Sequence, residues 1–116
     1  MEVCEDIYLI SKELPKEELY GLISQLKRSA VSIAANISEG AGRNSDNEFL
    51  HFLGVANASS FELQTHIIIA NRVGLLNDEI KESFLEKLDE IQKMSYGLQS
   101  LLKNKKINLY NLKSKV

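Results

Sequence analysis

Apolar residues recur at intervals of three and four along almost the whole sequence, a spacing that places them on one face of a helix. The first such run ends at Pro15, the only proline, because a proline ring forces the preceding residue out of helical geometry. A single proline in 116 residues favours long uninterrupted helices over a turn-rich β fold. The predicted helices cover residues 1–14, 16–39, 46–73 and 78–104.

The breaks between the later helices carry start and stop signals. Gly40 and Gly74 stand where a glycine commonly ends a helix. Ser45 and Glu48 have the spacing of a capping box, in which each side chain accepts a hydrogen bond from the other residue's backbone amide. Short connections between amphipathic helices predict an all-α fold. We expect an antiparallel up-down-up-down four-helix bundle over residues 1–104 and a basic C-terminal tail over residues 105–116.

The first predicted helix is much shorter than the other three. A bundle with one short member leaves an apolar groove open, so either residues upstream of Met1 complete the helix or another chain covers the groove. The second and third helices also carry apolar residues outside their main stripes, at Val31, Ala34, Ala35, Ile68 and Ile69. This second apolar face favours oligomerisation, although deep burial of the two middle helices would also explain it.

Charge is distributed unevenly, although the net charge is only −2. Residues 1–18 hold six acidic and two basic residues, whereas the sequence after Glu90 holds six lysines and no acidic residue. The basic end predicts either an arm that binds nucleic acid or an acidic partner, or favourable charge at a helix C-terminus. The candidate nucleic-acid contacts are Lys27, Arg28, Arg43, Lys103, Lys105 and Lys106.

Residues that build catalytic or metal sites are sparse. Cys4 is the only cysteine, which excludes an intrachain disulfide and favours a reducing cytoplasm. Glu48 and His51 have the spacing used by di-iron bundles, and Glu62 and His66 lie one helical turn apart, but two ligands do not close a metal site. We expect no cofactor, no metal and no enzymatic activity. No apolar run approaches the length of a membrane span, so no membrane association is expected either.

Polar residues also form lines along otherwise apolar helices. The candidate polar network consists of Ser32, Asn36, Glu39, Arg43, Glu62 and His66. Gly40 is expected to end the helix before Arg43, whose side chain could still fold back and pair with Glu39. Such lines predict a satisfied network that fixes the packing register of the helices, and the lining of a channel shared between subunits is the alternative.

Two stretches, YGLISQLKRSA at residues 20–30 and NISEGAGR at residues 36–43, are more distinctive than the periodicity around them. With the Glu62-Leu63-Gln64 triplet, they resemble the bacterial four-helix bundle proteins encoded in 23S ribosomal RNA intervening sequences. The accessory variability protein of diversity-generating retroelements is similar to the same family. The resemblance extends over residues 1–76.

The resemblance implies a left-handed antiparallel bundle that assembles as a homopentameric ring, with a first helix that begins upstream of this sequence. The retroelement relatives imply, in addition, binding to a reverse transcriptase and to nucleic acid. We therefore expect a non-enzymatic, homo-oligomeric, cytoplasmic protein that associates with RNA or a ribonucleoprotein. A protein-interaction scaffold that binds no nucleic acid is the alternative, and salt-dependent RNA binding separates the two.

Overall fold

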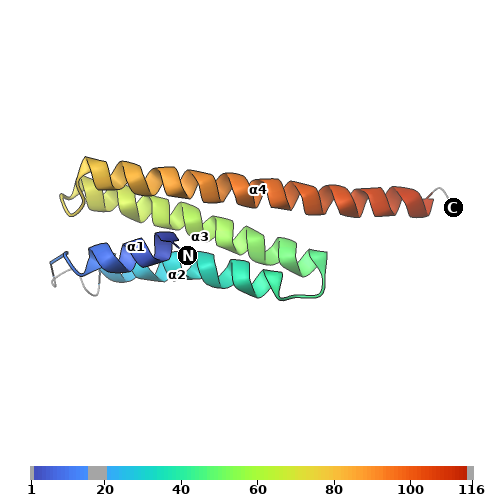
Figure 1. Cartoon of the computed structure of the whole chain (residues 1–116), viewed down its shortest axis with the longest axis horizontal. Helices are drawn as coiled ribbons and strands as arrows, with labels where there is room; N and C mark the ends of the chain where they lie inside the picture. Colours follow the sequence, from blue (N-terminus) through green and yellow to red (C-terminus); the bar gives the residue numbers. More distant parts are fainter. Residues whose placement is uncertain (1, 16–20, 115–116) are drawn as a thin grey trace.

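A computed structural model of the chain describes residues 2–15 and 21–114, with side chains described as far as Lys105. In this part of the chain four α-helices follow one another without a β-strand. They are α1 (Glu2–Ser11), α2 (Leu22–Ala41), α3 (Asp46–Arg72) and α4 (Asp78–Ser114) (Figure 1). The predicted all-α four-helix fold with a short first helix is confirmed.

The helices run alternately up and down, and α2 and α3 form a hairpin along which α4 lies (Figure 1). Most of the large side chains that are fully buried belong to α2 and α3, with one from α1 and one from α4; they include Ile7, Leu26, Ile33, Leu63, Ile67 and Leu88. Burying such side chains is the main source of stability for an amphipathic helix in a bundle. The apolar stripes of the sequence therefore meet in one core.

Gly40 lies inside α2 rather than after its end, which corrects the predicted boundary at residue 39. A Cβ atom at this position would lie 2.7 Å from Cβ of Phe52 and 3.0 Å from Cδ1 of Phe49. The glycine is therefore required by the close approach of α2 to α3. Gly74, in contrast, follows the end of α3 with φ of +84°, a backbone conformation that glycine adopts without strain.

The other helix ends differ in how well they were predicted. The Glu48 amide donates to Ser45 Oγ at 3.2 Å, so Ser45 caps α3 as expected. The start of the second helix, predicted at residue 16, lies outside the described residues, and α1 ends at Ser11 rather than at residue 14. The last helix ends at Ser114 rather than at residue 104, because no glycine or proline interrupts the sequence between them.

The short α1 covers only the first part of the bundle (Figure 1). Met94 and Leu101 of α4 have exposed fractions of 65% and 64%. Apolar surface is thus left uncovered along the second half of α4. Among the described residues, no helix combines the length and apolar character needed to cross a membrane.

Candidate functional site

A polar cluster joins the outer faces of α2 and α3 at Arg28. The Arg28 guanidinium forms an ion pair with Glu62 and donates hydrogen bonds of 2.7 and 3.0 Å to the side-chain carbonyl of Gln25. His66 Nε2 lies 3.4 Å from the same Glu62 carboxylate. Glu62 and His66 were predicted as network residues, whereas Arg28 was predicted only as a nucleic-acid contact. The spacing of Gln25 and Arg28, three residues apart on one helix, was the available signal for their pairing.

A second polar group crosses between α2 and α3 at Ser32. Its hydroxyl lies 2.7 Å from the hydroxyl of Ser59, and Asn36 Nδ2 donates to the Ser32 carbonyl at 2.8 Å and to Ser32 Oγ at 3.1 Å. These contacts satisfy polar groups at a half-buried helix–helix interface. The two predicted residues Ser32 and Asn36 therefore come together, and Ser59 joins them.

The third group lies at the end of α2. Arg43 forms an ion pair of 2.5 Å with Glu39, and its guanidinium carbon lies 5.1 Å from the centroid of the Phe52 ring. Arg43 thus folds back onto Glu39 although α2 continues past Gly40. The six predicted network residues are distributed among three local groups, since residues at successive turns of a rigid helix each meet different neighbours on α3.

Three of the candidate cations, two in α2 and one just after it, have partners within their own chain. The Lys27 ammonium lies 5.0 Å from the centroid of the Tyr8 ring of α1, a cation–π contact. Arg28 and Arg43 are paired with Glu62 and Glu39. The carboxylates offset part of the positive charge of the two arginines, whereas the neutral ring beside Lys27 leaves its charge uncompensated.

The basic residues of α4 lie in a different environment. Lys103 and Lys105 are exposed, and Lys105 Nζ lies 3.5 Å from Asp46 Oδ2 at the first residue of α3. The helix after Lys105 therefore extends past the α2–α3 hairpin (Figure 1). Lys103 forms no ion pair with any residue whose side chain is described. Lys106 belongs to the projecting part of α4, and its side chain lies outside the described residues.

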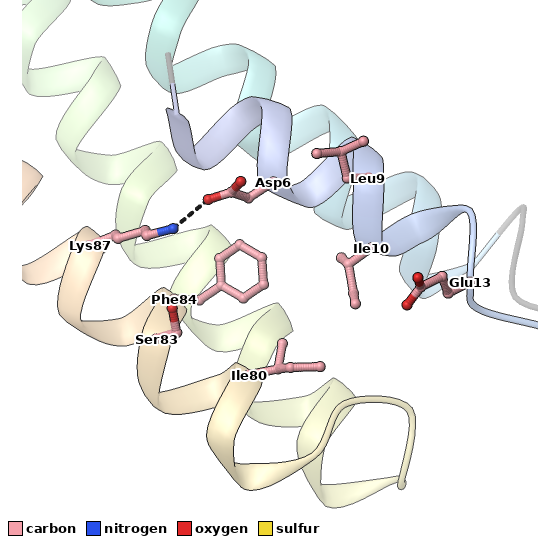
Figure 2. A pocket seen from close by; sticks show the side chains of 8 residues that line it. All are labelled: Asp6, Leu9, Ile10, Glu13, Ile80, Ser83, Phe84 and Lys87. Atoms are coloured by element: carbon pink, nitrogen blue, oxygen red, sulfur yellow. Dashed lines mark hydrogen bonds and ion pairs between the residues drawn. The ribbon is translucent and has the colours of Figure 1, made fainter.

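An acidic and apolar groove separates α1 from the first half of α4. A cavity of about 270 Å³ lies beside the Asp6–Lys87 pair, with Phe84 and Ile80 facing Ile10 across it (Figure 2). A second cavity of about 170 Å³ continues past Lys87. We call the two cavities together the α1/α4 groove; its walls comprise Glu2, Val3, Asp6, Leu9, Ile10, Glu13, Ile80, Ser83, Phe84, Lys87, Glu90, Ile91 and Met94.

Lys87 bridges the two helices at the centre of this groove. Its ammonium forms ion pairs with Asp6 and, at 3.2 Å, with Glu2. Its hydrogen bonds to Asp6 and then to Glu2 raise the pKa of Lys87, because both favour the charged form. This site was not predicted from the sequence, where the only signal for it was the four-residue spacing of two acidic residues, Glu2 and Asp6, on α1.

The described residues give no support to a metal centre. Within them, no group of three or more His, Cys, Asp or Glu side chains is placed to hold a metal ion. His51, which has the di-iron spacing from Glu48, instead packs edge-on against Phe52 with 5.3 Å between the ring centroids. Glu62 and His66 lie together, but Glu62 is also paired with the cation Arg28, which disfavours a metal ion there.

The family model described as 23S rRNA-intervening sequence protein matches residues 1–97. That range includes α1, α2, α3 and α4 as far as Gly97, and it stops before Lys103 and Lys105. A search among curated proteins finds no match.

Proposed function

Because the chain belongs to the 23S rRNA-intervening sequence protein family, we propose that it is a non-enzymatic, self-associating bundle that binds RNA through the basic end of α4. The description of the family connects it with ribosomal RNA. The observation that carries the proposal is the extension of a lysine-rich helix past the body of the bundle. We place the protein in the cytoplasm, where its one free cysteine, Cys4, stays reduced.

The chemistry of the α4 end suits a phosphate backbone. Lys103 and Lys105 are exposed, and the sequence adds Lys106, Lys113 and Lys115 without any acidic residue after Glu90. The nine helical residues 106–114 extend α4 by about 13 Å past Lys105. A projecting helix with this charge can contact several phosphates, each of which releases counterions when it is neutralised.

Lys27, Arg28 and Arg43 support this surface in a secondary role. Arg28 and Arg43 are each paired with a carboxylate, and Lys27 lies over the Tyr8 ring. Lys105 also has a carboxylate partner, Asp46 at 3.5 Å, so the preference for the α4 end rests on its projection and on its several lysines in a stretch without acidic residues. On this ground we rank Lys103, Lys105 and Lys106 first among the predicted RNA contacts.

Self-association is supported by apolar residues on the surface of the described part of the chain. Val31, Phe61 and Ile69 have exposed fractions of 42%, 50% and 43%. Monomeric proteins suppress contiguous apolar surface, and such residues commonly mark subunit interfaces. The family resemblance implies a homopentamer, and sedimentation velocity tests both the association and its stoichiometry.

RNA binding is tested with a fluorescently labelled RNA hairpin, whose affinity is measured by anisotropy between about 50 and 200 mM salt. We expect binding that weakens steeply with salt. Replacing Lys103→Gln and Lys105→Gln should lower the slope of log affinity against log salt by about 1.5 to 2, because two phosphate contacts are lost. Lys12→Gln with Lys93→Gln is the matched control, since it removes two exposed lysines from elsewhere. Absence of binding at low salt, or equal effects of the two pairs, would contradict the proposal.

A protein-interaction scaffold is the second candidate, and the open α1/α4 groove favours it. Wild-type protein that recovers a specific protein partner, with no affinity for RNA at low salt, would support the scaffold instead. Recovery of RNA alone would count against it.

A further inference from the structure

The α1/α4 groove combines an apolar floor with a negative rim. Glu2, Asp6, Glu13 and Glu90 contribute four carboxylates to its walls against the single ammonium of Lys87. Leu9 and Met94, which lie on opposite helices, have exposed fractions of 60% and 65%. A ligand that fits this surface carries apolar groups flanked by positive charges.

The end of α4 has the complementary character. Leu101, with an exposed fraction of 64%, is followed by the exposed lysines Lys103 and Lys105. Beyond them, lysines flank a stretch that holds the apolar residues Ile107, Leu109, Tyr110 and Leu112; the lysines are Lys106, Lys113 and Lys115. The helix continues to Ser114 past the α2–α3 hairpin, so no part of that hairpin lies beside it (Figure 1).

A chain cannot place the end of α4 in its own groove. The groove is built on α4 itself, from Ile80 to Met94, and the basic segment starts at Leu101 on the same continuous helix. A helix advances about 1.5 Å per residue in one direction, so the two surfaces stay apart and face different neighbours. The α4 end of a second copy, in contrast, can reach the groove and matches it in charge and apolar character.

We propose that residues 101–114 of one chain dock in the α1/α4 groove of another copy, with lysines on the acidic rim and apolar residues on its floor. The contact is heterologous, because it joins two different surfaces of the same chain. Repetition of such a contact closes a ring or extends a filament, depending on the angle between successive copies. This inference rests on the self-association part of the proposed function and specifies the surfaces that meet. Because the same lysines are the proposed RNA contacts, RNA and the groove compete for the end of α4.

The test isolates the contact with a labelled peptide of residues 101–116 and full-length protein as receptor. In a receptor that carries Lys103→Glu and Lys105→Glu, the grooves are not filled by neighbouring copies, so the peptide should bind more tightly than to wild type. Adding Glu13→Lys and Glu90→Lys should weaken peptide binding about tenfold or more, because like charges then meet at the rim. Both glutamates are exposed, so the fold should be retained, and circular dichroism checks this.

Glu79→Lys with Glu86→Lys is the matched control, since both residues are exposed on α4 outside the walls of the groove. It should leave peptide affinity unchanged. A peptide in which Lys103 and Lys105 are replaced by glutamate should regain affinity for the Glu13→Lys and Glu90→Lys receptor. Failure of the lysine peptide to bind, or equal binding to the groove variant and the control, would overturn the proposal.

Sedimentation and RNA affinity separate this inference from the proposed function. The full-length Glu13→Lys and Glu90→Lys variant should sediment as a smaller species than wild type while its α4 end remains intact for RNA. If that variant still assembles like wild type, self-association stands and the docking inference falls. The Lys103→Gln and Lys105→Gln double variant is the second comparison. If it loses RNA binding but assembles like wild type, the RNA proposal is supported and the docking inference is contradicted.

Discussion

α2 and α3 meet through small side chains, whereas α1 and α4 are joined by a charged bridge with open space beside it. At the first contact Ser32 and Ser59 touch at 2.7 Å, and Gly40 leaves no room for a methyl group. At the second contact Lys87 reaches across to Asp6 and Glu2, next to a cavity of about 270 Å³. Dense packing fixes the relative position of two helices, and loose packing leaves an accessible surface. The α2–α3 hairpin is therefore the closely packed part of the bundle, and the α1–α4 side carries the proposed binding surface.

The largest expected effect comes from creating a cavity between α2 and α3, where packing is dense. Leu63 of α3 is fully buried, so Leu63→Ala should lower the free energy of unfolding by about 2–5 kcal/mol. Leu9→Ala in the α1/α4 groove should cost less than about 0.5 kcal/mol, because Leu9 is already 60% exposed. Urea denaturation measures both values. Similar losses at the two positions would show that the groove is as well packed as the hairpin.

A smaller effect is expected where α2 crosses closest to α3. Gly40→Ala adds a methyl group that would lie 2.7 Å from Cβ of Phe52, and relief requires the two helices to move apart. We expect a loss of about 1–3 kcal/mol in the free energy of unfolding, even though alanine has the higher helix propensity. Urea denaturation is again the measurement. An increase in stability would mean that α2 and α3 are not in close contact at this point.

A glycine-to-alanine substitution in α4 should change the free energy of unfolding in the opposite direction. Gly97 is exposed within the helix, and a Cβ atom there would meet nothing within 4 Å. Gly97→Ala should raise the free energy of unfolding by about 0.5–1 kcal/mol, because it removes only the entropic cost of glycine. Thermal and urea unfolding of Gly40→Ala and Gly97→Ala, measured together, compare the effect of the same methyl group at a helix crossing and on an open helix surface. Destabilisation by Gly97→Ala would reveal a contact at this face of α4.

These two glycines also show what sequence could and could not predict. Apolar periodicity, the break at Pro15 and the cap at Ser45 were local signals, and they predicted the helices and their antiparallel order. The role of Gly40 depends on Phe52, twelve residues further along the chain and on another helix, so local reasoning mistook it for a helix end. The end of α4 was misplaced for a related reason, since a helix without a stop signal can continue past the bundle that supports it.

The contacts of the candidate site show the same difference between residues that are close in sequence and residues on separate helices. Pairs four residues apart in the sequence, such as Glu39 with Arg43 and Glu62 with His66, are visible in the sequence and are found in contact. Pairs that join two helices, such as Arg28 with Glu62 and Lys87 with Asp6, depend on the rotation of each helix about its axis. The charge asymmetry between the two ends of the chain was evident from sequence, but its placement on a groove and on a projecting helix was not.

The smallest expected effect concerns the Lys87 bridge on the binding side of the bundle. Lys87→Met keeps most of the apolar stem and removes the charge, so it should lower the free energy of unfolding by about 0.2–1 kcal/mol at pH 7. Because folding raises the pKa of Lys87, the contribution is fully present below its ordinary value of 10.5 and is lost as the pH rises through the higher folded pKa. The difference in free energy of unfolding between wild type and variant should therefore shrink above pH 10.5, as measured by urea denaturation across that range.

Amide exchange should locate the effect of Lys87→Met in α1, because Lys87 bridges α4 to Glu2 and Asp6 of α1. The control Lys93→Met should leave exchange in α1 unchanged, because Lys93 pairs with Asp89 within α4. If faster exchange appeared in α2 and α3 instead, the bridge would belong to the closely packed part of the bundle and the division between the two pairs of helices would fail.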